Sequence, residues 1–304
     1  MAVALAVHAA DFAELARHGL FGSLAFREYL RRAEAGLRAL RGQGVEVHLR
    51  VFEPADYADY CEAFGLDPGS AGARVAYAAD PELAGEPFVY GGERLTELLP
   101  VLADDHLARV RISIACAVLV DAVGDGPSGH ARLVAVMHHV TSVYLALAEG
   151  AGEGGHLLTL RCHGPEDGEH LTAAADVRTD GGQLFVGGRD AEAFCATLAA
   201  GVALGGAGAL LLHGAPTTPG GQVVRGWALA AGRLRPMAVR EVVDALADDA
   251  ALGVPFPSGA VPLPGFPLPA PPPGMPSSSD ADPWPGGASS DGGDLGPEGG
   301  EPLR

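Results

Sequence analysis

The last fifty residues constrain most strongly what this chain can fold into. Residues 255–304 hold 14 of the 24 prolines and 10 of the 44 glycines. Proline donates no backbone hydrogen bond, and glycine loses more entropy on ordering than any other residue, so such a segment forms no packed core. We therefore expect a globular body at 1–254 and a disordered tail at 255–304, first Pro-rich and then acidic.

The body combines helical and strand patterns, so the expected fold class is α+β. Its length suits one domain, built either as a single body or as two lobes that meet near residue 150, because the pattern becomes strand-rich after Gly155. The first part of the Pro-rich tail still holds Phe256, Phe266 and Leu268, which can lie against the body. The strands expected in the second half are 156–162, 170–178, 183–187, 209–213 and 222–230.

Residues 23–41 show the clearest helical pattern in the first half. Leu30 and Leu37 lie on one apolar stripe, and Gly42 can end the helix. Strict alternation then predicts a half-buried strand at 45–52. Weaker patterns predict strands at 74–78 and 87–90 and a helix from 95 onwards, and they leave 110–120 open between helix and strand.

Charge and composition exclude several function classes. The net charge is −18, all 20 basic residues are arginine, and lysine and asparagine are missing, a composition typical of GC-rich genomes such as those of actinobacteria. Without lysine there is no phosphate-loop lysine and no Schiff-base lysine. A polyanion also repels nucleic acid and anionic membranes, so neither is an expected partner. The oligomeric state does not follow from the sequence.

Location follows from the termini and the cysteines. The apolar run at Met1–Ala10 has no basic residue before it, which differs from a secretory signal. Four cysteines without a CxxC pattern indicate reduced thiols. The uncharged stretch 193–224 predicts a helix at 190–203 and a buried strand at 209–213 rather than a membrane span. We expect a soluble, cytoplasmic protein.

One glycine pattern suggests a cofactor. Gly124, Gly126 and Gly129 form a GxGPSG sequence, and Glu149 follows twenty residues after the last glycine. This pattern resembles the GxGxxG loop of Rossmann dinucleotide-binding proteins and of many flavoproteins. The resemblance implies a pyrophosphate held by backbone N–H groups at a helix start, and hence a nucleotide- or flavin-binding enzyme. The alternative is a plain loop between two elements, with no cofactor.

Two further groups suggest metal or catalytic chemistry. Cys162, His163 and His170 lie close in sequence and are ligand types that Zn²⁺ accepts. Adjacent strand residues face opposite ways, however, so a polar hairpin is the alternative. The segment ending in His213–Gly214 resembles the strand and His-Gly of α/β-hydrolases, but the chain has no GxSxG nucleophile, which favours a buried strand ending in a turn.

The most informative surface feature is a basic stripe on the 23–41 helix. At 100° per residue, Arg27, Arg31, Arg38 and Arg41 fall within about 80° of one another. They form either an ordinary solvated face or a docking surface for an acidic protein partner, including the acidic tail. We therefore favour a non-catalytic binding or accessory protein that acts through protein–protein contacts, with the nucleotide- or flavin-binding enzyme as the alternative.

Overall fold

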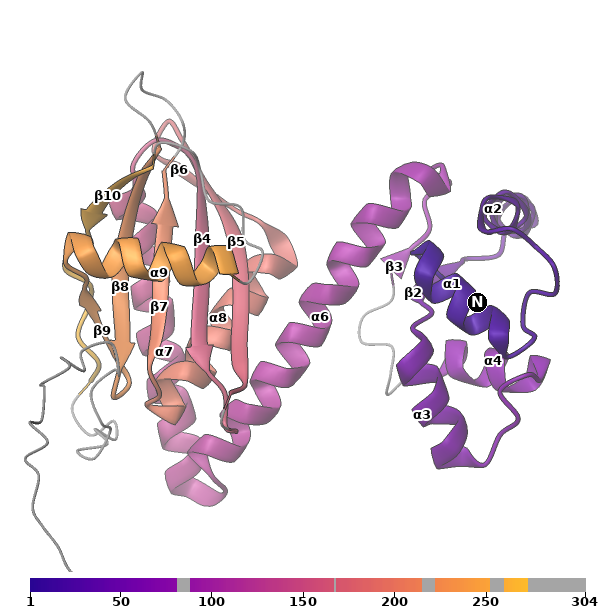
Figure 1. Cartoon of the computed structure of the whole chain (residues 1–304), viewed down its shortest axis with the longest axis horizontal. Coiled ribbons are helices and arrows are strands. Elements are labelled where there is room, and N and C mark those ends of the chain that lie inside the picture. Colours follow the sequence, from indigo (N-terminus) through magenta and orange to yellow (C-terminus); the bar gives the residue numbers. More distant parts are fainter. Residues whose placement is uncertain (81–87, 167, 215–221, 252–259, 273–304) are drawn as a thin grey trace, which may run out of the picture.

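The chain folds into two lobes joined by one long helix (Figure 1). Within its described part, the computed structural model contains eight helices and two mixed sheets, which confirms the α+β class. Each sheet belongs to one lobe and has its own hydrophobic core. The residues that the structure describes are 1–80, 88–166, 168–214, 222–251 and 260–272.

The N-terminal lobe packs four helices around a three-stranded sheet with the order β1-β2-β3. Strand β2 pairs in parallel with β1 and antiparallel with β3. The strands expected at 45–52 and at 87–90 are confirmed in shorter form. The elements are β1 (Ala2–Leu5), α1 (Ala9–Arg17), α2 (Phe26–Gly42), β2 (His48–Val51), α3 (Pro54–Phe64), α4 (Ala71–Ala79) and β3 (Phe88–Val89).

Helix α4 replaces the strand expected at 74–78, so that prediction is wrong. The alternation of Val75 and Tyr77 with small residues suggested a strand, but Ser70 caps a helix instead. Its Oγ accepts a hydrogen bond from the N–H of Ala73 at 3.1 Å. The cap satisfies one of the free N–H groups of the first turn, and Tyr77 is then buried against the rings of Tyr57 in α3 and of Phe52, which follows β2.

Helix α6 (Leu95–Val123) connects the lobes and changes its buried face along its length (Figure 1). Its first turns bury Leu95 and Leu98 in the N-terminal lobe, whereas Leu119 and Val123 are buried in the C-terminal lobe. At 100° per residue the mean directions of the two complete buried stripes, Leu95, Leu98, Leu99 and Leu102 against Ala115, Leu119 and Val123, differ by roughly 110°. The ambiguity at 110–120 is therefore resolved as helix, and its pattern is weak because no single face stays buried.

The C-terminal lobe is built on a seven-stranded sheet with helices on both faces (Figure 1). Along the sheet the order is β10-β8-β7-β4-β5-β6, and β9 pairs with β8. Helix α9 covers one face, and α6, α7 and α8 lie on the other. The elements are α7 (Gly126–Ala151), β4 (Gly154–His163), β5 (His170–Asp180), β6 (Gln183–Val186), α8 (Gly188–Leu204), β7 (Gly208–His213), β8 (Val223–Ala230), β9 (Arg233–Pro236), α9 (Val239–Ala251) and β10 (Val261–Pro264).

Helix α8 explains the long uncharged stretch. It is buried almost all round between the sheet and the other helices, and β7 follows it as a buried strand, as expected. One described helix, α7, is long and apolar enough to cross a membrane by length and composition alone. That test is weak evidence, because α7 buries Val136, Val140 and Leu147 in the protein core.

The Pro-rich segment is partly ordered, which corrects the expected tail boundary. Strand β10 pairs in parallel with β8, and residues 265–272, called the strap below, continue along α7. Trp227 Nε1 donates a hydrogen bond to the carbonyl of Phe266 at 2.7 Å, and the two rings pack edge to face. A buried aromatic partner thus orders this stretch despite its prolines. The rest of the expected tail, 255–259 and 273–304, lies outside the described residues.

Candidate functional site

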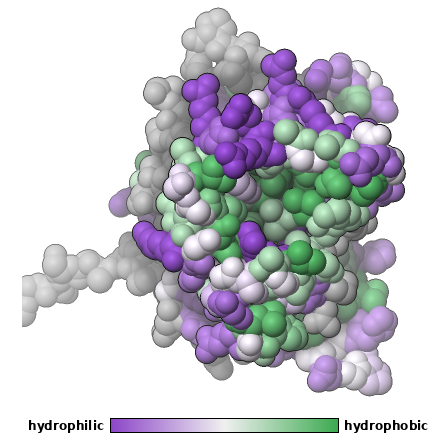
Figure 2. Space-filling view, turned by 90° about the vertical axis from the view of Figure 1, so that its right-hand side faces the viewer, coloured by the Kyte–Doolittle hydropathy of each residue, from purple (hydrophilic) through white to green (hydrophobic). Residues whose placement is uncertain are grey.

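The outer face of α2 holds the four arginines of the predicted stripe. Arg27, Arg31, Arg38 and Arg41, called the arginine face below, are all exposed, while Leu37, on the adjacent side of the helix, is buried. Figure 2 shows hydrophilic side chains gathered along the top of the N-terminal lobe, where Figure 1 places α2. The predicted geometry is therefore confirmed, and its role as a docking surface stays a prediction.

Two glutamates on α2 pair with some of these arginines. Glu28 accepts hydrogen bonds from Arg31 and Arg32 at 2.8–2.9 Å, and these bonds lower the pKa of Glu28 to about 2. Arg38 lies 2.6 Å from Glu34. Five arginines and two glutamates leave the helix with a net positive charge on an acidic chain.

The remaining two arginines differ in their surroundings. Arg41 donates a hydrogen bond to the carbonyl of Gly91 and lies over the ring of Tyr90. These contacts hold its side chain against the residues that connect β3 to α6. Among the residues that the structure describes, no carboxylate or carbonyl pairs with Arg27. Arg27 is therefore the most available cation of the arginine face, and Arg31 follows because its side chain is 77% exposed although it pairs with Glu28.

The glycine loop lies between two helices instead of a strand and a helix. Gly124 ends α6 and Gly126 begins α7, both with a positive φ that other residues rarely adopt. A Cβ at Gly129 would lie 1.8 Å from the carbonyl oxygen of Gly124. The tight turn of this helical hairpin thus accounts for all three glycines. The loop lacks the strand-to-helix context on which the resemblance to dinucleotide-binding proteins depends.

The three suggested metal ligands do not converge. Cys162 points into the core beneath α8, where burial raises the pKa of its thiol to about 12. His163 and His170 lie on the other face as a cross-strand pair, with ring centroids 5.3 Å apart. Within the described ranges no group of three His, Cys, Asp or Glu side chains is placed to hold a metal ion.

The sequence analysis missed an ionic network where the lobes meet. Asp105 of α6 accepts from Arg109 at 2.6 Å and from Arg189 of α8 at 2.8 Å. Beside it, His106 lies 3.3 Å from Glu53 of the N-terminal lobe. No pattern in the sequence points to this network, because the arginine of α8 that pairs with Asp105 lies 84 residues away in sequence.

A second polar group lies under α9. His213 Nε2 is 3.2 Å from the hydroxyl of Thr159, which also hydrogen-bonds Asp249. All three side chains are buried, and burial lowers the pKa of His213. Such a chain satisfies polar groups inside a core, and it confirms the expected buried strand at 209–213.

A family model described as a domain of unknown function (DUF8829) matches residues 1–93. The matched range coincides with the N-terminal lobe and stops just before α6. The chain is similar to this family over under a third of its length. No curated protein and no solved structure matches the chain.

Proposed function

We propose that this protein is a non-catalytic binding or accessory protein of the cytoplasm, and that the arginine face of α2 docks an acidic segment of a partner protein. The observation that supports it is a row of exposed arginines on a chain with a net charge of −18. Guanidinium groups bind carboxylates through two parallel hydrogen bonds, which makes such a row selective for Asp and Glu side chains.

The arginines are not needed to hold α2 in place. Leu30, Leu37 and Leu40, together with the uncharged Tyr29, attach the helix to the core of the N-terminal lobe. Exposed ion pairs contribute little to stability, so the contacts of Arg31 with Glu28 and of Arg38 with Glu34 can be exchanged for a partner's carboxylates at little cost to the fold. Glu34 has a structural task besides its pair with Arg38, because it accepts a hydrogen bond from the N–H of Leu95 at 3.2 Å.

The expected partner is acidic protein rather than nucleic acid. Phosphate binding would require many more uncompensated cations than α2 provides, since affinity for nucleic acid scales with the number of phosphates neutralised. Residues 277–304 of this chain, with six acidic residues and one arginine, are the nearest acidic candidate. They lie outside the described residues.

A labelled decaglutamate peptide tests the proposal by fluorescence anisotropy. We expect binding to the full chain that weakens with salt and is lost in the double variant Arg27→Ala/Arg31→Ala. The matched control, Arg178→Ala/Arg233→Ala, removes the same charge from exposed positions of the C-terminal lobe. Equal losses in both double variants would contradict a specific surface on α2. Tighter binding after deletion of 277–304 would identify the tail as the occupant.

A further inference from the structure

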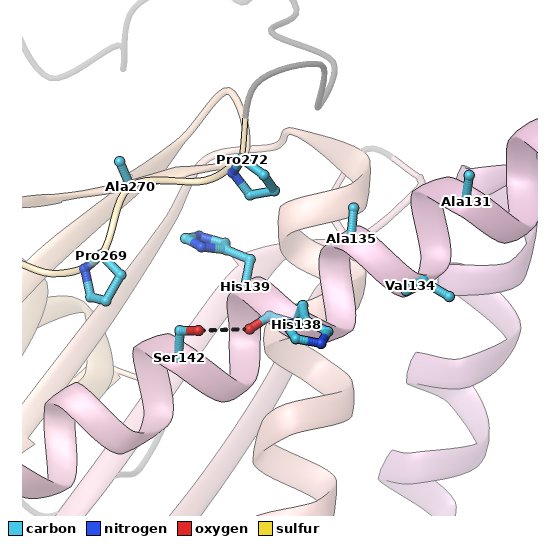
Figure 3. A pocket seen from close by; sticks show the side chains of 9 residues that line it. All are labelled: Ala131, Val134, Ala135, His138, His139, Ser142, Pro269, Ala270 and Pro272. Atoms are coloured by element: carbon cyan, nitrogen blue, oxygen red, sulfur yellow. Dashed lines mark hydrogen bonds between the residues drawn. The ribbon is translucent and has the colours of Figure 1, made fainter.

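We propose that the hollow between α7 and the strap is a binding site for an uncharged, mostly apolar small molecule with one hydrogen-bonding group, such as a phenol. The hollow has a volume of about 430 Å³, within the range of small-molecule sites. Figure 3 shows the nine residues that line it: Ala131, Val134, Ala135, His138, His139, Ser142, Pro269, Ala270 and Pro272.

His139 is the residue that indicates a ligand. Its side chain is only 4% exposed, lines the hollow and points toward the strap (Figure 3). Its Nε2 atom is buried and has no hydrogen-bond partner in the described structure. A buried polar atom without a partner costs free energy that a ligand group would recover.

The lining also limits the charge of the ligand. None of the described residues that line the hollow is Asp, Glu or Arg, so no carboxylate or guanidinium among them balances an ionic ligand. Burial lowers the pKa of His139, which keeps its imidazole neutral near pH 7. A neutral imidazole exchanges one hydrogen bond with a hydroxyl, and the alanine, valine and proline walls suit an apolar ring.

The strap forms one wall of the hollow, and contacts with α7 on one side and with β8 on the other anchor it. Phe266 lies against Gly150, where an added Cβ would be 2.1 Å from its ring, and Leu268 packs on the main core. Arg225 donates to the carbonyl of Pro264 at 3.0 Å just before the strap. These contacts hold the first part of the strap along α7, directly before Pro269, Ala270 and Pro272 of the lining.

Titration of the full chain with 2-naphthol and naphthalene tests the site, because only the first carries a hydroxyl. We expect one 2-naphthol per chain, and His139→Phe should weaken its binding about tenfold while leaving naphthalene unchanged. Val134→Trp, at a position 48% exposed on the rim, should fill the hollow and weaken both ligands more than tenfold. His130→Phe makes the matched substitution on α7 outside the hollow and should alter neither.

Several results would overturn the site. One is the absence of saturable binding to the full chain, as would occur if residues after Pro272 occupied the hollow. Another is binding that Val134→Trp leaves intact. A third is an equal loss of both ligands in His139→Phe with an unchanged melting temperature, which would show that the imidazole does not contact the hydroxyl. If His139→Phe fails to fold, the Val134→Trp variant and the affinity difference between the two ligands still decide.

Discussion

The N-terminal lobe fills much of its core with aromatic rings, whereas the C-terminal lobe relies on aliphatic and small side chains. Phe12, Phe52, Tyr57 and Tyr77 belong to a continuous set of ring contacts in the first lobe. In the second lobe, alanines and Gly201 let α8 approach the sheet closely. The same degree of burial is thus reached by large rings in one lobe and by close backbone approach in the other.

This difference determines which substitutions each lobe tolerates. A core of few large rings is sensitive to truncation, because each ring fills a large volume and little else can replace it. A core of closely packed helices and strands is sensitive to added atoms, because the backbones must move apart to admit them. The two lobes meet mainly through α6 and the ionic network around Asp105, so we expect each to respond to its own substitutions.

The largest expected effect is the loss of one central ring in each lobe. Tyr57→Ala and Trp227→Ala each remove a fully buried side chain together with its hydrogen bond, to Pro68 and Phe266 respectively. Each should lower the free energy of unfolding of its own lobe by about 3–5 kcal/mol. Hydrogen–deuterium exchange resolves the two lobes, and equal loss of protection in both lobes for either variant would show a single cooperative unit.

Opposite effects are expected from the same substitution at two glycines. At Gly201, an added Cβ would lie 2.8 Å from Cys162 Sγ and 3.0 Å from Leu229 Cδ2, so Gly201→Ala should cost about 1–2 kcal/mol. At Gly36, on the exposed side of α2, nothing lies within 4 Å. There Gly36→Ala should stabilise by about 1 kcal/mol through helix propensity. Chemical denaturation measures both, and a stabilised Gly201→Ala would contradict close packing of α8.

The sequence predicted the elements whose buried face stays constant. Helix α2 and strand β2 each keep one apolar face, so their periodicity was sufficient. Helix α6 was ambiguous because its buried face turns between the lobes. Helix α4 was predicted as a strand at 74–78, whereas the cap by Ser70 makes this segment helical. Local patterns therefore failed where tertiary contacts or a single side-chain cap decided the structure.

The two candidate sites also differ in how far the sequence alone could place them. The arginine face lies on one helix, so spacing alone placed it. The hollow has one wall on α7 and the other on the strap, more than a hundred residues later, in a segment whose composition predicted disorder. The ordering of that segment depends on Trp227, which no pattern within the tail reveals. Sites assembled from distant segments require the fold to be known.

A smaller effect is expected on acidification, and it should concern the C-terminal lobe. Burial lowers the pKa of His139 and His213 below the ordinary value of 6.5. Between that value and the lower folded pKa, the unfolded chain binds more protons than the native one. The stability present above pH 6.5 is therefore lost as pH falls.

Chemical denaturation at about pH 7.5 and about pH 5.5 measures this loss. His139→Phe should reduce the pH dependence, whereas His130→Phe, at an exposed position, should leave it unchanged. Glu28 does not interfere, because its pKa of about 2 lies below this window. An equal pH dependence in His139→Phe and in the unaltered chain would contradict the burial of the His139 imidazole.

The smallest effect is expected at the arginine face, and it separates binding from folding. Arg31 pairs with Glu28 on the open surface, and Arg27 has no partner among the described residues, so water replaces both side chains without leaving a buried charge. Arg27→Ala/Arg31→Ala should therefore leave the unfolding of both lobes unchanged. Arg189→Ala is the comparison, because this arginine is only 27% exposed and lies 2.8 Å from Asp105, itself 18% exposed. Its loss removes one of the two arginines that pair with this half-buried carboxylate and should cost about 1 kcal/mol, after allowance for solvent screening. A marked loss of stability in the α2 double variant would mean that these arginines support the fold, and would remove the basis for assigning them to a partner.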